Sequence, residues 1–141
     1  MELPPSDVLQ ELYGRLAPAH FFTQLLQEFH CSGQGIYVPA LVIWLMLRQQ
    51  LYGQGTLAEA VQQVVLGEPR RLLPEHKRVR EQTVSTNTGG YSQARSRLPL
   101  KMLEKVARQI FQDMLPRTAE AGFATRVYLL DGSGLLLPHT Q

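Results

Sequence analysis

The chain has 141 residues, of which 44% are hydrophobic and 18% are charged. This composition excludes a wholly disordered protein and predicts a packed globule. The lone cysteine, Cys31, excludes an internal disulfide bond and fits a reducing compartment. No signal peptide is visible, and the longest apolar run, residues 40–47, is far shorter than the ~20 residues that cross a bilayer. We therefore expect a cytoplasmic protein with no membrane-spanning segment.

Charge is distributed unevenly, although the net charge is only +2. Residues 1–69 carry two basic and six acidic side chains, whereas residues 70–108 carry ten basic and three acidic ones. Residues 109–141 carry two basic and three acidic side chains. A basic block in a nearly neutral chain is typical of a surface that faces a polyanion such as DNA. A solvated basic face without a partner gives the same pattern, so charge alone leaves both interpretations open.

Helical periodicity dominates the first half of the chain. Hydrophobic side chains recur at helical spacing over residues 6–16 and 21–29, which predicts two amphipathic helices packed as an antiparallel pair. The next helix begins near Pro39 and is apolar on nearly every side over its first two turns. We therefore expect this third helix at the centre of a helical bundle.

A glycine turn and a capped helix follow. Gly53 and Gly55 end the third helix, and Thr56 with Glu59 forms a capping box that begins the fourth. That helix ends at Gly67. Helix, short turn and capped helix give a helix-turn-helix outline, which also occurs in helical proteins that never touch DNA.

The second half begins with a polar stretch. Residues 67–90 are interrupted by prolines and glycines, so we expect an exposed connector with one short helical segment around residues 74–81. A short helix then starts at Tyr91 and is limited by Pro99. A strong amphipathic helix follows, and we expect Pro116 to stop it.

The pattern changes near the end of the sequence. After Gly122, the short apolar runs "RVYLLD" and "LLLP" are separated by "GSG", which predicts two strands joined by a tight turn. The expected fold is therefore mainly α, with five to seven helices over residues 1–122 and a β-hairpin within residues 123–141.

The segment "YSQARSRL" is the main candidate for DNA contact. At about 100° per residue, Gln93 and Arg97 share one face, which we expect to point to solvent and to reach phosphates or base edges. Tyr91 and Arg95 share the other face with apolar neighbours, so Arg95 either contacts DNA or has a structural role, in which it stacks on Tyr91 or pairs with a core carboxylate. Lys101 extends this basic strip, as do Lys105 and Arg108 in the next helix.

Asp131 stands out at the end of the first predicted strand. A buried carboxylate there needs compensation, because burial penalises its charged form. The compensation is either a turn, in which Asp before Gly accepts backbone N–H bonds, or a divalent cation, since hard oxygen ligands suit Mg²⁺. The residues alone leave both possibilities open.

Three blocks of the sequence resemble one known family. "VPALVIWLMLRQQL…GTLAEAVQQV", "TGGYSQARSRLPL" and "YLLDGSGLLLPHT", in that order, are similar to the N-terminal part of bacterial DDE transposases of the insertion-sequence-four type. The resemblance covers the chain from about Val38 onward and is weaker before it. It implies a helical DNA-binding or dimerisation region followed by the start of a ribonuclease-H-like catalytic domain. Gly134 departs from the family pattern, in which a hydroxyl residue is frequent at this position.

The resemblance assigns Asp131 as the first carboxylate of the Asp-Asp-Glu triad, and hence as a catalytic and metal-binding residue. Two Mg²⁺ ions about 3.5–4 Å apart would serve the family's phosphoryl transfer. The implied partners are double-stranded DNA at transposon ends and a second copy or a full-length transposase, with no membrane and no small-molecule substrate. The second Asp and the Glu are not among these residues, so we expect a truncated reading frame or remnant.

Two other interpretations remain open. One is a stand-alone helical DNA-binding or dimerising module without catalysis, which would inhibit a full-length transposase by occupying its DNA ends or forming mixed dimers. The other is a helical interaction protein unrelated to DNA, against which the basic block argues.

The lone carboxylate leads to a prediction for the isolated 141-residue chain. Incubated with transposon-end DNA and Mg²⁺ or Mn²⁺, it should leave both strands intact, because one carboxylate cannot hold a pair of divalent ions. Denaturing electrophoresis of end-labelled DNA measures this, and cutting by the purified chain would contradict it.

Overall fold

The computed structural model describes residues 4–53 and 55–120, and every regular element within them is an α-helix. In chain order the helices are α1 (Ser6–Leu16), α2 (Ala19–Glu28), α3 (Pro39–Leu51), α4 (Leu57–Val65), α5 (Lys77–Arg80), α6 (Gly89–Arg97) and α7 (Leu100–Glu120). The mainly α prediction is therefore confirmed for this part of the chain. The predicted β-hairpin within residues 123–141 lies outside the described residues. Among the described helices, none is long and apolar enough to cross a membrane.

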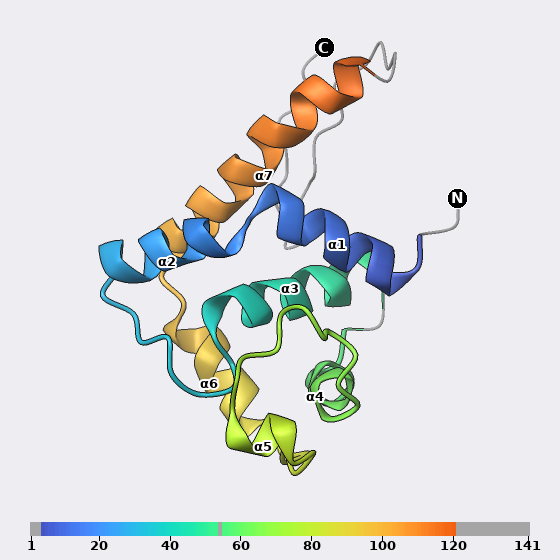
Figure 1. Cartoon of the computed structure of the whole chain (residues 1–141), viewed down its shortest axis with the longest axis vertical. Helices are drawn as coiled ribbons and strands as arrows, with labels where there is room; N and C mark the ends of the chain where they lie inside the picture. The colour runs from blue at the N-terminus through green and yellow to red at the C-terminus, as the bar shows by residue number, and fades with distance from the viewer. Residues whose placement is uncertain (1–3, 54, 121–141) are drawn as a thin grey trace.

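Helix α3 forms the centre of the structure. Its residues 41–45 are all buried, with no side chain more than 4% exposed, so the helix is enclosed on every side. Figure 1 shows α1 and α2 on one side of α3 and α4, α5 and α6 on the other. The central position predicted from the apolar character of this helix is confirmed, and Pro39 occupies its first turn as expected.

Tyr13 joins three helices at one point of the core. Its ring lies 5.5 Å from the Trp44 ring and 6.1 Å from the Phe22 ring, measured between centroids. The Tyr13 hydroxyl donates a hydrogen bond of 2.7 Å to the Ala40 carbonyl oxygen, so the phenol is both packed and satisfied. Burial raises the pKa of Tyr13 well above its usual value, which keeps this donor protonated.

Helices α1 and α2 differ from the predicted antiparallel pair. Only Ala17 and Pro18 separate them, and Figure 1 shows them end to end along one side of the molecule. The short connection holds the second helix nearly in line with the first instead of folding it back. α1 instead packs against α7, where the Gln109 side-chain amide lies 3.5 Å from the Leu16 carbonyl oxygen.

Helix α7 also differs from expectation, because Pro116 does not stop it. The helix continues to Glu120. Proline has a backbone φ that suits a helix, and its main effect is to remove the hydrogen bond to the carbonyl four residues earlier. One missing bond in a helix of 21 residues does not end it. Near its start the helix buries Met102 and Val106 completely or almost completely, which anchors it in the core.

The remaining predicted boundaries agree with the structure to within a few residues. Thr56 caps α4, its hydroxyl oxygen accepting the Glu59 N–H at 3.2 Å. The connector between α4 and α6 contains one short helix, α5. α6 begins two residues earlier than predicted, at Gly89, and ends just before Leu98 and Pro99.

Three helices end in the same hydrogen-bonded turn, with a left-handed residue after the cap. The left-handed residue is Gly67 after α4 (φ 69°), but it is His30 after α2 (φ 53°) and Gln82 after α5 (φ 57°). The following N–H donates back across the last turn in each case, from Cys31 to Leu26 (3.0 Å), from Glu68 to Gln63 (3.0 Å) and from Thr83 to Arg78 (2.8 Å). These bonds define the Schellman motif, in which glycine is preferred because a Cβ strains the left-handed backbone.

This motif predicts opposite effects for two matched substitutions. His30→Gly should raise the free energy of unfolding by about 0.5–1 kcal/mol, and Gly67→Ala should lower it by a similar amount. Urea unfolding of the two variants beside the unsubstituted chain measures both changes. Equal destabilisation by both variants would show that the His30 side chain stabilises the fold by contacts other than the turn.

Candidate nucleic-acid interface

Tyr91, one of the predicted DNA-contacting residues, lies in the core. Its side chain is fully buried, and its hydroxyl donates a 2.6 Å hydrogen bond to the Gln49 side-chain oxygen on α3. The Tyr37 ring packs beside it at 5.6 Å. Burial raises the pKa of Tyr91 to about 12, an effect that the nearby positive charge of Arg95 partly offsets. Tyr91 therefore fastens α6 to α3 and presents no surface to DNA.

Arg95 covers Tyr91 from the solvent side. Its guanidinium carbon lies 5.7 Å from the Tyr91 ring centroid, an arrangement typical of a cation–π contact. The side chain as a whole remains exposed. Arg95 thus stacks on Tyr91, which is one of the roles that the sequence left open, and the side chain remains accessible to water.

The other predicted contact residues lie on the outside. Gln93, Arg97 and Lys101 are all exposed, as the helical face assignment predicted. Arg97 and Lys101 form no ion pair with the acidic residues that the structure describes. The two side chains come from different helices, on either side of the bend at Leu98 and Pro99. The end of α6 and the start of α7 therefore carry polar and basic side chains that are free to bind a ligand.

The strip along α7 is only partly available. Lys101, Lys105 and Arg108 recur at intervals of four and three residues and therefore share one face of the helix. Lys105 forms an ion pair with Glu28 of α2, and its ammonium nitrogen lies 5.8 Å from the Phe29 ring centroid. Its charge is already partly compensated within the chain, so Lys101 and Arg108 are the stronger candidates for phosphate contact.

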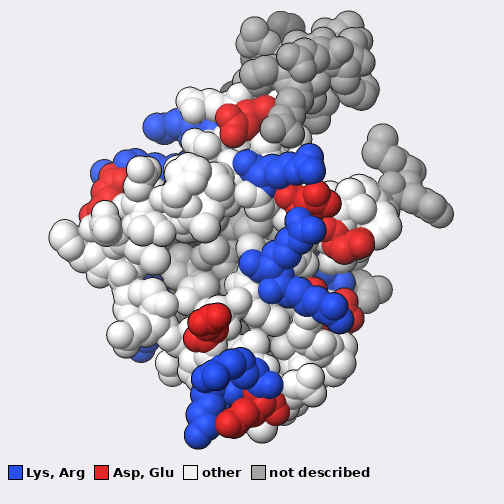
Figure 2. Space-filling view, viewed as in Figure 1, with Lys and Arg blue, Asp and Glu red and all other residues white. Residues whose placement is uncertain are grey.

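The whole basic block of residues 70–108 lies at the surface. All ten of its lysine and arginine side chains are exposed. Among the described acidic residues, only Glu11 and Glu28 pair with members of the block, Arg71 and Lys105. Figure 2 shows a group of basic side chains over the end of the molecule where α5 lies, and a second group on the right with acidic side chains among them. The block is therefore spread over several parts of the surface.

Helix α4 does not contribute to this positive surface. It contains no lysine or arginine, and Glu59 is among its exposed side chains. A helix that enters a DNA groove is expected to carry basic and amide side chains toward the phosphates and bases. The predicted helix-turn-helix outline therefore exists as two successive helices, but the charges lie elsewhere, on α5, α6 and α7.

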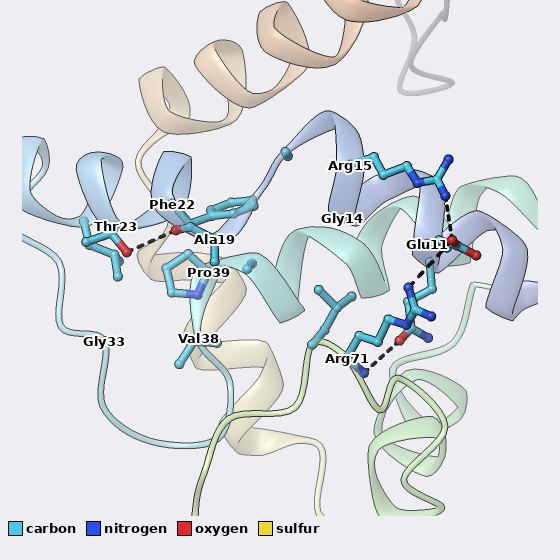
Figure 3. A pocket seen from close by; sticks show the side chains of 15 residues that line it. Glu11, Gly14, Arg15, Ala19, Phe22, Thr23, Gly33, Val38, Pro39 and Arg71 are labelled. Carbon is cyan, nitrogen blue, oxygen red and sulfur yellow. Dashed lines mark hydrogen bonds and ion pairs between the residues drawn. The ribbon is translucent and has the colours of Figure 1, made fainter.

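One pocket lies away from the predicted contact residues. It has a volume of about 540 Å³ and opens between α1, the first turns of α2 and the start of α3. Figure 3 shows Phe22, Val38 and Pro39 on one side of it. Arg15 and Arg71 lie on the other side, both directed to the Glu11 carboxylate at 2.9 and 4.0 Å. The single Glu11 carboxylate is thus shared by two arginines, which leaves one positive charge in excess, and nothing in the lining indicates a reaction.

A second pocket has a different chemical character and was not predicted from the sequence. It has a volume of about 470 Å³. Its lining residues come from three separate segments and are Ile36, Tyr37, His76, Arg78, Val84, Ser85, Asn87 and Gly90. No acidic side chain lines it. The only part of the lining that forms a recognisable sequence feature is the polar stretch "STNTGG", and by itself this stretch predicts no more than an exposed connector.

The proposed catalytic residue Asp131 lies outside the described residues. Within residues 4–53 and 55–120, no group of three or more histidine, cysteine, aspartate or glutamate side chains is arranged to hold a metal ion. The Mg²⁺ expectation thus depends on residues that the structure does not describe.

Comparison with known proteins adds no assignment. No family model, no curated protein and no solved structure matches this chain. The resemblance of its motifs to insertion-sequence-four transposases therefore stands on the sequence blocks alone.

The buried Tyr91 phenol predicts a loss of stability at high pH. Its pKa is raised from about 10 in the unfolded chain to about 12 in the folded one, so its contribution is complete below pH 10 and disappears as the pH rises through 12. Tyr91→Phe should remove this part of the pH dependence, leaving the part due to Tyr13. At neutral pH it should cost about 1 kcal/mol, because the Gln49 oxygen loses its donor. Urea unfolding between neutral pH and pH 12 measures both effects, and an unchanged pH dependence would contradict the assignment.

Proposed function

We propose that this chain is the DNA-binding N-terminal region of a DDE transposase of the insertion-sequence-four type. The observation that carries the DNA-binding part is the exposure of all ten basic side chains of residues 70–108, eight of which pair with no described acidic residue. The three sequence blocks that resemble the family support the choice of transposase over other DNA-binding proteins.

Surface cations that lack a partner within the chain can be neutralised by a partner outside it. Duplex DNA carries one negative charge per about 1.7 Å of helix axis, and each phosphate that a lysine or arginine neutralises releases counterions. A basic surface that is only solvated by water does not need a large excess of positive charge. Residues 70–108 nevertheless carry a balance of +7. The acidic side chains of residues 1–69 leave most of these cations unpaired, so an extended polyanion is the best-fitting partner.

The residues take different roles in this proposal. Arg97 and Lys101 contact phosphates, and Gln93 reaches a phosphate or a base edge beside them. Arg95 contributes charge while it covers the Tyr91 ring. Residues 123–141 form the first two strands of a ribonuclease-H-like domain, in which Asp131 supplies the first metal-binding carboxylate. Bound Mg²⁺ would supply the Lewis-acid chemistry of strand cleavage and transfer once the further acids of the triad join the site.

A non-catalytic helical module is the second candidate. It is favoured by the exposed basic side chains of residues 70–108, since DNA binding through them needs no metal-binding carboxylate. Such a module would bind transposon ends or pair with a full-length transposase without cutting DNA. Both candidates should lower the cleavage rate of an active transposase, because both bind its DNA ends. The nucleotide sequence downstream of codon 141 separates them, because only the transposase region should be followed by a frame that encodes a further Asp and a Glu.

Arg97 provides the direct test of DNA binding. Arg97→Ala should weaken binding to duplex DNA and reduce the slope of log K against log salt by about 1, because one phosphate contact is lost. Fluorescence anisotropy of a labelled duplex from about 50 to about 200 mM salt measures both. Arg15→Ala is the matched control, since Arg15 is equally exposed but lies on α1 in an ion pair with Glu11. An equal slope change in both variants would mean that binding follows net charge and not the proposed surface.

A further inference from the structure

The pocket between α5 and the start of α6 is lined by hydrogen-bond donors. Three of its side chains have acceptor atoms that are already occupied by backbone N–H groups. His76 Nδ1 accepts from Arg78 at 3.1 Å, Ser85 Oγ accepts from Asn87 at 3.1 Å, and Asn87 Oδ1 accepts from Gly89 at 2.7 Å. Each of the three still has a free donor, in the second imidazole nitrogen, the hydroxyl and the amide NH₂.

Arg78 adds a positive charge to these donors. Its side chain lines the pocket, is exposed, and forms no ion pair with the acidic residues that the structure describes. A guanidinium offers five N–H groups in a planar fork that suits two oxygens of one anion. Since no carboxylate lines the pocket, nothing within it competes for this charge.

Tyr37 supplies a further donor at this pocket. Its hydroxyl is buried and has no hydrogen-bond partner among the described residues, although the residue lines the same pocket. A buried hydroxyl without a partner costs free energy, so such atoms are rare unless something outside the chain satisfies them. Burial also raises the pKa of Tyr37, so the phenol remains a donor at neutral pH.

Gly90 lets the backbone approach the same space. It lies in the first turn of α6 and lines the pocket, and a Cβ added there would meet the Tyr37 ring at 3.4 Å. The N–H groups of Gly90 and Tyr91 have no backbone or side-chain acceptor among the described residues. First-turn N–H groups of a helix favour anions, so the backbone adds to the donors supplied by the side chains.

We propose that this pocket binds a phosphate group, held by the Arg78 guanidinium with Ser85, Asn87 and the Tyr37 hydroxyl. A phosphate fits because it presents only acceptor oxygens and negative charge to a lining of donors. The inference stands on the pocket and does not require the proposed function. The phosphate comes either from a DNA backbone or from a free phosphate compound, and the experiment separates these two sources.

The experiment follows the backbone amides of the full chain by NMR while inorganic phosphate is added, with chloride at equal ionic strength as the reference. We expect phosphate to shift the Gly90 and Tyr91 amides in a saturable manner. Arg78→Gln should weaken this binding at least tenfold. Arg80→Gln is the matched control, because Arg80 is an exposed arginine of the same helix that does not line the pocket, and it should change the affinity less than twofold.

Tyr37→Phe gives a second readout that survives if Arg78→Gln unfolds the chain. Without phosphate the variant should melt at a higher temperature, because an unpaired buried hydroxyl is gone. At saturating phosphate this advantage should disappear, because the unsubstituted chain gains a hydrogen bond that the variant lacks. A higher melting temperature that persists unchanged in phosphate would overturn the role of the hydroxyl.

A short duplex, titrated in the same way, identifies the source of the phosphate. If the duplex shifts the Gly90 and Tyr91 amides and Arg78→Gln abolishes the shift, the pocket holds a DNA phosphate. If phosphate binds but the duplex does not, the pocket stands and the proposed DNA-binding function fails. If the duplex binds and the pocket amides respond to neither ligand, the proposed function stands and the pocket assignment is overturned.

Discussion

The burial of α3 on all sides is the constraint on which the rest of the structure depends. Five successive side chains, residues 41–45, are removed from water, so neighbouring helices must cover every face of this short helix. Tyr13 covers it from α1 and Tyr91 covers it from α6, and each places a hydroxyl on an α3 acceptor, the Ala40 carbonyl and the Gln49 side chain. Apolar contact thus provides the stability, and the two phenols determine where the covering helices lie.

This arrangement determines where charge can lie. The described core contains one buried polar residue, Gln10, and no buried charged side chain. Gln10 holds the connector after α4, since its side-chain oxygen accepts the Arg71 N–H at 3.0 Å. Every lysine and arginine of residues 70–108 is consequently at the surface. Because α4 has no basic residue and α5 to α7 have many, the positive surface is formed by the second half of the chain and does not include α4.

Local sequence signals predicted the helices well because each signal acts over a few residues. The periodicity of α1, the Thr56 cap and the apolar run of α3 are all short-range features, and the structure confirms them. The predicted end of α7 at Pro116 was wrong, because the helix-forming residues on both sides of the proline outweigh the one hydrogen bond that it removes. The predicted antiparallel packing of α1 and α2 was also wrong. The two-residue connection at Ala17 and Pro18 does not by itself reveal the direction in which the second helix leaves the first.

The candidate sites were harder to predict, because they depend on contacts between distant segments. Gln93 and Arg97 lie outside as the helical face required, whereas Tyr91 is held in the core by Gln49, a residue 42 positions away. The donor-lined pocket joins residues 36–37, 76–78 and 84–90, and no local pattern brings these together. Where the sequence left Arg95 between two roles, the structure places it over an aromatic ring with its charge in solvent.

That position of Arg95 links the interior of the protein to its surroundings. A guanidinium over a ring shields the edge of the core, so any anion that draws it outward uncovers Tyr91 to water. A ligand that drew the Arg95 side chain off the ring would forgo this contact, so its net affinity would be lower by the free energy of the contact. The contact that covers the edge of the core thus also sets how readily Arg95 can move toward a ligand.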